Sequence, residues 1–396
     1  MPPAGGVGTM AAVPTTSRRA QRVPEVDDLV AFGREQGLDA VGVAPAAPFA
    51  TTLRHLQRRR VAGLHGGMAF TYRRPERSCD PGMALRDARA IVVGARGYRR
   101  VAPAEPAGRA SGAVGRVARY AWSDHYGPLR VALTAVARRL TEEGWRARVV
   151  ADDNALVDRE AAYRAGLGWY GKNANLLLPG EGSWFVLGSV VTDAPLDPGP
   201  ARVEDGCGTC TRCLDGCPTG AIVAPGVVDA RRCLAWLLQV EGPFPREQRV
   251  ALGDRLYGCD DCQEVCPPNR RVERTVAAGE AEPPAQATVD VVDLLGASDH
   301  ELLARHGRWY IPRREARYLR RNALVVLGNA GDPGDARVIA ALARCLRSED
   351  GLVRSHAVWA ARRLGRDDLL VGDGLDLDAD PDPLVQAELS AAVERR

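Results

Sequence analysis

Short apolar runs alternate with amphipathic segments along the first 200 residues of this 396-residue chain. Helical spacing of apolar positions predicts helices over Glu25–Gln36, Thr52–Arg60 (strongly basic), a segment beginning near Pro128, and Leu156–Ala165. Runs rich in Val, Ile and Leu predict strands at residues 38–44, 90–95, 146–150, 175–178 and 184–191. This alternation indicates an α/β (α+β) domain, which we assign to residues 25–200.

The C-terminal third has a different pattern. Residues 320–346 and 351–365 show paired amphipathic helices joined by Gly/Asp turns, which is typical of HEAT-like repeats. We assign these repeats to residues 290–372, after a Pro/Ala/Glu-rich linker at 277–289. The remaining divisions are a disordered N-terminal tail at 1–24, a cysteine-rich domain at 201–276 and an acidic C-terminal segment at 373–396.

Composition restricts the possible classes of protein only slightly. The chain is 45% hydrophobic and 26% charged, which suits two or three globular domains, and its net charge of +3 argues neither for nor against nucleic acid. Neither a secretory signal nor an apolar stretch of about 18 residues is visible, so we expect no membrane association and a cytoplasmic location.

Eight cysteines dominate the cysteine-rich domain. The segment CGTCTRCLDGCP gives CxxCxxCxxxCP spacing, Cys233 stands alone, and CDDCQEVCPPN gives CxxCxxxCP spacing. Eight cysteines suffice for two 4Fe–4S clusters, and in bacterial ferredoxins the cysteine before proline ligates the other cluster. We therefore predict that cluster 1 binds Cys207, Cys210, Cys213 and Cys266, and cluster 2 binds Cys217, Cys233, Cys259 and Cys262.

Two other interpretations of these cysteines were weighed. Structural zinc sites usually present cysteines as separated pairs, which fits three cysteines at i, i+3 and i+6 poorly. Disulfides are disfavoured by consecutive CxxC spacings in a chain with no visible signal peptide. The two remaining cysteines, Cys79 and Cys345, are expected to be ordinary thiols.

Ala151–Gly188 is the second region dense in reactive residues. It combines adjacent acids, glycine-rich turns and Lys172, the only lysine among 53 basic residues. It holds no Walker A motif, no GxGxxG between a strand and a helix, and no Ser/His/Asp order of acyl transfer. The glycines would let the backbone approach a large flat ligand, such as a redox cofactor that turns single electrons into bond cleavage. A hairpin with a solvated lysine is the alternative.

Several segments together resemble the epoxyqueuosine reductase family, over about Glu25 to Leu370: ADDNALVDR, AGLGWYGKN, GSWFVLG, CGTCTRCLDGCPTGAI, YGCDDCQEVCPPN and RRNALVVLGNAGD. The resemblance implies a cobalamin-dependent iron–sulfur enzyme that reduces epoxyqueuosine at the tRNA wobble position, in the last step of queuosine biosynthesis. It also implies a cobalamin-binding catalytic domain, a ferredoxin-like double 4Fe–4S domain and C-terminal HEAT-like repeats that help hold the tRNA.

The resemblance also suggests roles for single residues. Asp152 matches the family's proton donor, and burial beside a corrin would raise its pKa enough to keep it protonated. The family's GRDYH stands here as WSDHYG, which leaves the roles of Asp124, His125 and Tyr126 open. We expect cofactor contacts from Arg77, Asp152, Lys172, Asn173, Leu176 and Ser183.

The partners follow from the same resemblance and from charge. Seven arginines against one acid fill residues 305–321, which indicates either a solvated helix face or a surface for tRNA phosphates. We expect tRNA binding by Arg313, Arg314, Arg317, Arg320 and Arg321. An unidentified one-electron donor of flavodoxin or ferredoxin type is the other partner, and we expect a monomer.

Two other functions are alternatives to this one. A cobalamin-dependent reductive dehalogenase would share the core but usually carries an export signal and lacks the C-terminal repeats. A ferredoxin-like electron-transfer protein would need only about the 70 residues of the cysteine region, not the 200 residues that precede it.

Overall fold

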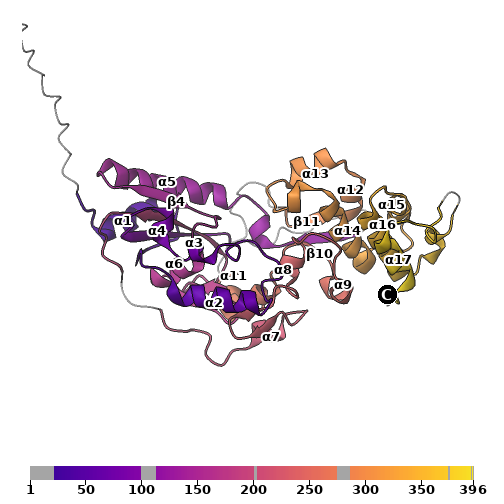
Figure 1. Ribbon diagram of the computed structural model, residues 1–396, viewed down its shortest axis with the longest axis horizontal. Coiled ribbons are helices and arrows are strands. Elements are labelled where there is room, and N and C mark those ends of the chain that lie inside the picture. Colours follow the sequence, from indigo (N-terminus) through magenta and orange to yellow (C-terminus); the bar gives the residue numbers. More distant parts are fainter. Residues whose placement is uncertain are drawn as a thin grey trace, which may run out of the picture.

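The computed structural model describes residues 22–99, 113–199, 203–273, 286–372, 375–393 and 395. Figure 1 shows α1–α6 gathered at one end of the molecule and α12–α17 at the other, with β10 and β11 between them. The predicted disordered tail lies outside the described residues except for 22–24, as does the predicted linker except for 286–289.

A four-stranded antiparallel sheet forms the centre of the first end. Its order is β1 (Ala40–Pro45), β2 (Ala90–Gly97), β7 (Phe185–Thr192) and β4 (Ala147–Val150). The central strands β2 and β7 are almost continuously buried, which explains their unbroken apolar sequences. These four strands were predicted from the sequence.

Helices cover both faces of this sheet. The helices α1 (Val26–Glu35) and α5 (Tyr126–Glu142) pack on one face, and α2 (Ala50–Val61) and α6 (Asp158–Arg164) share the core on the other. All four were predicted, although α5 begins slightly earlier than the expected Pro128.

A glycine pair fixes how closely α5 approaches the sheet. Gly94 of β2 and Gly188 of β7 are register partners, and Leu133 of α5 lies over both. A Cβ atom on Gly188 would stand 2.6 Å from Leu133 Cδ1, and one on Gly94 would stand 3.1 Å from Cδ2. The missing side chains therefore form the depression that Leu133 fills.

The cysteine-rich region consists of short elements. Besides the hairpin β8 (Ile222–Ala224) and β9 (Val227–Val228), it holds α7 (Arg212–Asp215), α8 (Leu234–Leu237), α9 (Arg246–Leu252), α10 (Asp261–Glu264) and α11 (Pro267–Glu273). The small elements preceding it are α3 (Pro75–Ser78), α4 (Pro81–Ala84) and the hairpin β5 (Trp169–Tyr170) with β6 (Leu176–Leu177).

A second sheet joins distant parts of the chain. The strand β3 (Val114–Val117) pairs in parallel with β10 (Arg255–Tyr257) and antiparallel with β11 (Thr288–Asp290). Its side chains belong to the same core as the C-terminal helices. The sequence pattern placed residues 102–115 in a loop, so it missed the start of β3.

Six helices complete the C-terminal end: α12 (Val291–Gly296), α13 (Asp299–His306), α14 (Arg317–Ala330), α15 (Ala336–Leu346), α16 (Gly351–Arg363) and α17 (Pro383–Ser390). Side-chain caps begin several of them, as where Asp350 accepts from Leu352 N at 2.8 Å. The segment predicted to be an acidic end contains α17, whose buried Glu388 pairs with Arg249 at 2.7 Å. Among the described helices, none is both long and apolar enough to cross a bilayer.

Candidate functional site

The loop that carries Asp152 connects β4 to α6, and hydrogen bonds from another part of the chain fix its position. Asn154 Oδ1 accepts from Thr71 N at 2.6 Å, and Asn154 O accepts from Ser78 Oγ at 2.6 Å. Asp152 itself has a φ of 52°, in the left-handed region that Asp and Asn tolerate better than most residues. The loop is therefore fixed in a conformation that few residue types can adopt.

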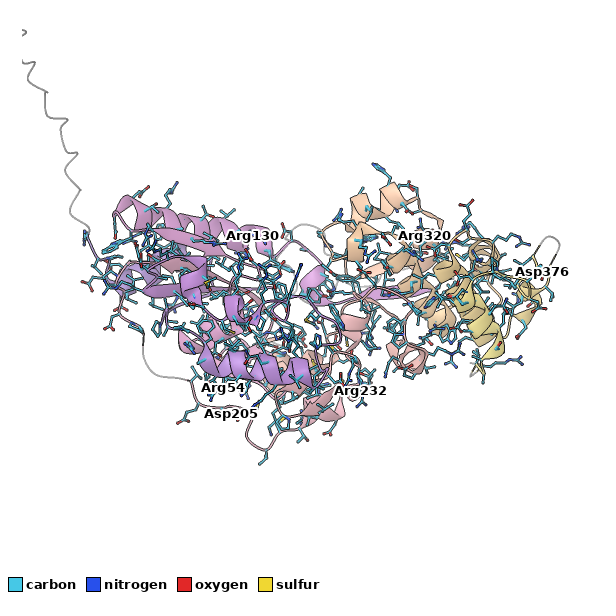
Figure 2. All side chains as sticks on the ribbon, viewed as in Figure 1. Arg54, Arg130, Asp205, Arg232, Arg320 and Asp376 are labelled. Atoms are coloured by element: carbon cyan, nitrogen blue, oxygen red, sulfur yellow. The ribbon has the colours of Figure 1, made fainter. Side chains whose placement is uncertain are left out.

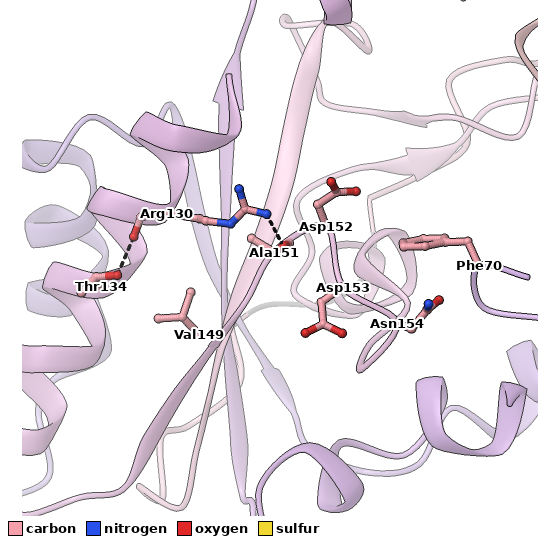
Figure 3. A pocket seen from close by; sticks show the side chains of 8 residues that line it. All are labelled: Phe70, Arg130, Thr134, Val149, Ala151, Asp152, Asp153 and Asn154. Atoms are coloured by element: carbon pink, nitrogen blue, oxygen red, sulfur yellow. Dashed lines mark hydrogen bonds between the residues drawn. The ribbon is translucent and has the colours of Figure 1, made fainter. Parts of the chain in front are cut away.

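A cavity of about 620 Å³ opens beside this loop, and Figure 3 shows its walls. The carboxylates of Asp152 and Asp153 point in opposite directions, while Arg130 reaches across from α5 and donates to Ala151 O at 3.0 Å. The lining residues are Phe70, Arg130, Thr134, Val149, Ala151, Asp152, Asp153 and Asn154.

The electrostatic environment of Asp152 favours its protonated form. Partial burial raises the pKa of Asp152 above its ordinary value, Arg130 opposes that rise, and Asp153 adds to it. The side chain still reaches solvent through the open cavity. Asp152 thus combines access for a substrate with a proton that is held more tightly than on a free carboxyl group.

Asp158, at the start of α6, is a second acid in the same region. Burial raises its pKa well above the ordinary value, and the nearby charge of Asp152 raises it further. Its Oδ1 atom is buried without a hydrogen-bond partner among the described residues. The pKa of Tyr126 is also raised, first by burial and then by Asp152 and Asp158. The two acids and this phenol therefore form one group.

The WSDHYG segment contributes to this group through Tyr126 rather than through Asp124. Asp124 Oδ1 accepts from Gly127 N at 2.8 Å at the start of α5. His125 is buried, and its ring stacks on Tyr98 with centroids 5.1 Å apart. Asp124 therefore stabilises the first turn of α5, and His125 packs in the interior.

The four cysteines predicted for cluster 1 line one cavity of about 270 Å³. Burial raises the pKa of Cys266 to about 11, and the thiol groups of Cys207, Cys213 and Cys210 add to that rise. The four residues are therefore electrostatic neighbours although Cys266 lies about 50 residues further along the chain. Over the described residues, no group of three or more His, Cys, Asp and Glu side chains is arranged around a single metal ion; a 4Fe–4S cluster instead spreads its four thiol ligands over four irons.

The cysteines predicted for cluster 2 form the other neighbourhood. Burial raises the pKa of Cys262 well above its ordinary value. The thiol groups of Cys259, Cys233 and, more weakly, Cys217 raise it further. Cys79 and Cys345 lie buried in separate hydrophobic cores. The eight cysteines thus fall into the two groups of four that the sequence spacing indicated.

Lys172 and Asn173 lie at the cluster 1 cavity and not among the residues that line the Asp152 cavity. Lys172 Nζ donates to Gly208 O at 2.7 Å, and Asn173 Nδ2 donates to Cys262 O at 3.2 Å. Asn173 therefore connects the β5–β6 hairpin to the segment that carries cluster 2.

Ser183 and Leu176 are interior residues. Ser183 N donates to Asn269 Oδ1 at 2.6 Å, and Gln263 Nε2 donates to Ser183 Oγ at 3.0 Å. Leu176 is 2% exposed within the core under α6. The Ser183 contacts join the cysteine-rich region to the segment before β7, whereas Leu176 packs within the core of the first domain.

Arg77 is exposed on α3, one residue before the Ser78 that holds the Asp152 loop. It is not among the residues that line either cavity. Arg77 is therefore next to a residue that holds the Asp152 loop, but the structure shows no contact between Arg77 and Asp152.

The arginines of residues 313–321 divide into exposed and buried members. Arg313 and Arg314 are exposed, and Arg313 pairs with Glu241 at 2.9 Å. Arg317 and Arg320 are partly buried and pair with acids of the same end of the molecule, Asp350 at 2.7 Å and Asp299 at 2.5 Å.

Arg321 does not belong to this surface, because it is fully buried. Its guanidinium donates to Val240 O at 2.6 Å, Gly242 O at 2.7 Å and Leu237 O at 3.1 Å. The expectation that Arg321 contacts tRNA phosphate is corrected accordingly. A run of arginines looks the same in sequence whether its members face water or fasten a neighbouring loop.

We expect Arg321→Leu to lower the free energy of unfolding by about 3 kcal/mol, because it leaves buried carbonyls without donors at roughly 1–3 kcal/mol each. Denaturant unfolding followed by circular dichroism measures this change. The matched control is Arg305→Leu on exposed α13, with an effect within about 0.5 kcal/mol. Equal stability of the two variants would show that the Arg321 contacts contribute little.

Sequence reasoning missed Arg130 and Asp158. Tyr126 and Arg130 are four residues apart on α5, and the guanidinium lies over the Tyr126 ring, 5.6 Å from its centroid. That i, i+4 spacing next to the WSDHYG segment was the available signal. Asp158 stood within the quoted ADDNALVDR segment, but nothing in the pattern distinguished it from an exposed helix-start acid.

Comparison with known proteins agrees with this arrangement. Residues 206–269 match the family model of the 4Fe–4S double cluster binding domain. A central sheet with an acid-bearing cavity, joined to a double-cluster segment, defines an iron–sulfur oxidoreductase. The chain belongs to the epoxyqueuosine reductase family, as the following similarities show.

The curated relatives cover nearly the whole chain. An epoxyqueuosine reductase of Bacillus anthracis is 30% identical over 373 residues, which is 93% of this chain and 96% of the relative. One from Pseudomonas aeruginosa is 35% identical over 362 residues, covering 89% of this chain and 96% of the relative. The resemblance inferred from the motifs is confirmed, and neither alternative function is favoured.

A solved structure supports the same assignment. The crystal structure of an epoxyqueuosine reductase with a tRNA-Tyr epoxyqueuosine-modified stem loop is 29% identical, with a TM-score of 0.80, and covers 92% of this chain and 96% of that one. A Bacillus subtilis epoxyqueuosine reductase, whose catalytic aspartate loop is swung out of the active site, is 28% identical with a TM-score of 0.79 and the same coverage.

Proposed function

We propose that this protein reduces the epoxide of epoxyqueuosine in tRNA to the cyclopentene of queuosine, using cobalamin and two 4Fe–4S clusters. The observation that carries the proposal is Asp152, an accessible acid with a raised pKa at the wall of a cavity. A relative bound to an epoxyqueuosine-modified tRNA stem loop and a relative with a catalytic aspartate loop support the substrate and the role.

The residues present suit these cofactors. Two groups of four thiols are the donor sets that two 4Fe–4S clusters require. The Asp152 cavity falls in the size range of cofactor sites, and the unpartnered Asp158 Oδ1 atom nearby could be satisfied by a polar cofactor. We assign Asp152 and Arg77 to the cobalamin side, and place Lys172 and Asn173 at cluster 1, with Leu176 and Ser183 as packing residues.

The reaction consumes two electrons and two protons, and it releases the epoxide oxygen as water. When bound, cobalamin supplies the reduced cobalt that delivers electrons to carbon. Asp152 supplies a proton to the departing oxygen, which is needed because water has a pKa of about 15.7 and hydroxide leaves poorly. Arg130 holds the backbone at Ala151 and so keeps the Asp152 carboxyl at the cavity.

The tRNA surface that we propose lies next to this acid. Tyr310 is 61% exposed, and its backbone N donates to Tyr257 Oη at 2.8 Å. Burial is the main cause that raises the pKa of Tyr257. Tyr257 is also close enough to Asp152 for the charge of that carboxylate to raise the pKa of Tyr257 further. An exposed ring beside the exposed Arg313 and Arg314 suits an unstacked loop base between phosphates. The α12–α16 helices, as HEAT-like repeats, would support this surface.

Reversing both charges in Arg313→Glu/Arg314→Glu should weaken tRNA binding and flatten its salt dependence, because phosphate contacts release counterions. We expect about tenfold or more loss at low salt, measured by fluorescence anisotropy of an anticodon stem loop, with normal cluster content. The control is Arg34→Glu/Arg138→Glu, on exposed positions of α1 and α5. Equal affinities for the two variants would reduce the arginines to a solvated surface.

The activity itself is tested by anaerobic incubation of the reconstituted protein with epoxyqueuosine-tRNA, cobalamin and dithionite, followed by nucleoside mass spectrometry. Conversion that depends on cobalamin supports the proposal. Absence of queuosine with both clusters and cobalamin loaded would refute it. We further propose a cytoplasmic monomer that receives electrons from a flavodoxin or ferredoxin type of protein.

A further inference from the structure

The two cysteine groups differ in how near they lie to the surface. The residues around Cys207 and Cys210 are exposed: Gly206, Gly208, Thr209 and Thr211. The residues on either side of Cys259, Gly258 and Asp260, are buried. Cluster 1 would therefore lie under an exposed loop, whereas the side of cluster 2 formed by Cys259 would be internal.

The internal group also lies on the side of the candidate active site. Asp260, next to Cys259, accepts from Arg119 N at 2.6 Å, in the segment that leads into α5 and its cavity residue Arg130. By contrast, Figure 2 shows Asp205, next to the cluster 1 loop, at the opposite edge of the molecule from Arg130 of the Asp152 cavity. Electrons that enter at cluster 1 would thus pass inward through cluster 2 toward the substrate.

The charged residues that line the cluster 1 cavity all have the same sign of charge. Lys172, Arg212 and Arg271 line it and no acid does; we call these three residues the cationic rim. Arg212 and Arg271 are exposed, and the structure shows no hydrogen bond or ion pair from either side chain to a described residue. Two such arginines are available for a partner.

Apolar surface accompanies this charge. Pro267 and Pro268, both partly exposed, line the same cavity, so the cationic rim is accompanied by a small apolar surface. Acidic electron-carrier proteins form small, short-lived complexes in which opposite charge steers the encounter. A surface of this kind, directly above a cluster, meets both requirements.

We propose that the cationic rim is the docking surface for an acidic one-electron carrier protein of the flavodoxin or ferredoxin type, which reduces cluster 1. This inference rests on the proposed function. In each encounter the reduced carrier would give up one electron, which the cluster held by Cys207, Cys210, Cys213 and Cys266 would accept. Two encounters supply the two electrons of one epoxide reduction, and the protons come from the protein and solvent.

The rim is separate from the proposed tRNA surface. Figure 2 shows Arg320 and Asp205 in separate parts of the molecule. Arg320 is close in sequence to the tRNA surface, and Asp205 is next to the rim. A carrier could therefore dock while tRNA is bound, which suits a reaction that needs two successive electrons. We accordingly assign the rim to a protein and not to nucleic acid.

The test uses the full-length, reconstituted protein carrying Arg212→Glu/Arg271→Glu, with Arg34→Glu/Arg138→Glu as the control of equal charge change. Stopped-flow absorbance follows cluster reduction by flavodoxin hydroquinone and, separately, by a reduced bacterial ferredoxin, at 50 and 200 mM salt. We expect reduction by at least one carrier to slow about tenfold or more at low salt in the rim variant only, with a weaker salt dependence.

Dithionite separates docking from damage to the cluster. We expect the rim variant to keep its cluster EPR signals, its dithionite-driven turnover and its tRNA affinity. Unchanged reduction by both carriers would overturn the proposal, and so would altered EPR signals or a matching loss of tRNA affinity. If carriers reduce the protein through the rim but epoxyqueuosine-tRNA is never converted, the proposed function fails while the docking surface stands.

Discussion

Asp152→Asn should lower turnover on epoxyqueuosine-tRNA by about 100- to 10,000-fold, the usual range for a lost general acid. Asparagine preserves the shape of the side chain and tolerates the φ of 52° at this position, so the loop should keep its conformation. Only the transferable proton is removed. Single-turnover assays with mass spectrometry measure the loss, while iron content and cobalamin binding should match the unmodified protein.

The neighbouring acid provides the control. Asp153 Oδ1 accepts from Ala155 N at 2.9 Å, a contact that Asp153→Asn preserves, so its effect should be far smaller. Because the pKa of Asp152 is raised, the proton is retained to higher pH than on a free carboxyl, and activity should fall as the pH rises through that pKa. If Asp152→Asn kept full turnover while Asp158→Asn or Asp124→Asn lost it, the donor would be reassigned.

Cys262→Ser should abolish turnover and remove about four of an expected eight irons and four of eight sulfides per chain. Cys262 has three other cysteines as electrostatic neighbours, and its backbone oxygen accepts from Asn173, so its loss should damage cluster 2. Iron and labile-sulfide analysis with EPR spectroscopy measures the change.

The matched control for this variant is Cys345→Ser. Cys345 lies in the C-terminal core, 4% exposed, and should leave all eight irons in place. A metal analysis that found zinc and no labile sulfide in the unmodified protein would refute both clusters together. Loss of iron from both variants alike would instead point to general instability.

The sequence predicted the central sheet and the cysteine groups because both follow local rules. Strands such as β2 are unbroken apolar runs, and ferredoxin spacing indicates which cysteines lie together. The strand β3 was not recognised in full, because it has four residues, one a glycine, and its partners lie about 140 and 170 residues away. Such pairing leaves no periodic signal in the strand itself.

The positions of individual side chains were harder to predict than the helices and strands. Lys172 was expected beside the corrin from the family's GKN segment; the β5–β6 hairpin places it at the cavity lined by Cys207, and contact with the corrin stays a prediction. Arg321 was grouped with its exposed neighbours, although helix periodicity turns it inward toward the loop at residues 237–242. In both cases tertiary contacts, which a single sequence does not display, decide the position.

The placement of β3 has a consequence for how the chain is made. Both of its partners, β10 and β11, are synthesised after it, and all eight cluster cysteines lie between β3 and β11. At about 5–20 residues per second, β3 waits on the order of ten seconds or more at the ribosome before β11 emerges. When β11 completes this sheet, all eight cysteines that we propose as iron ligands have therefore already been synthesised.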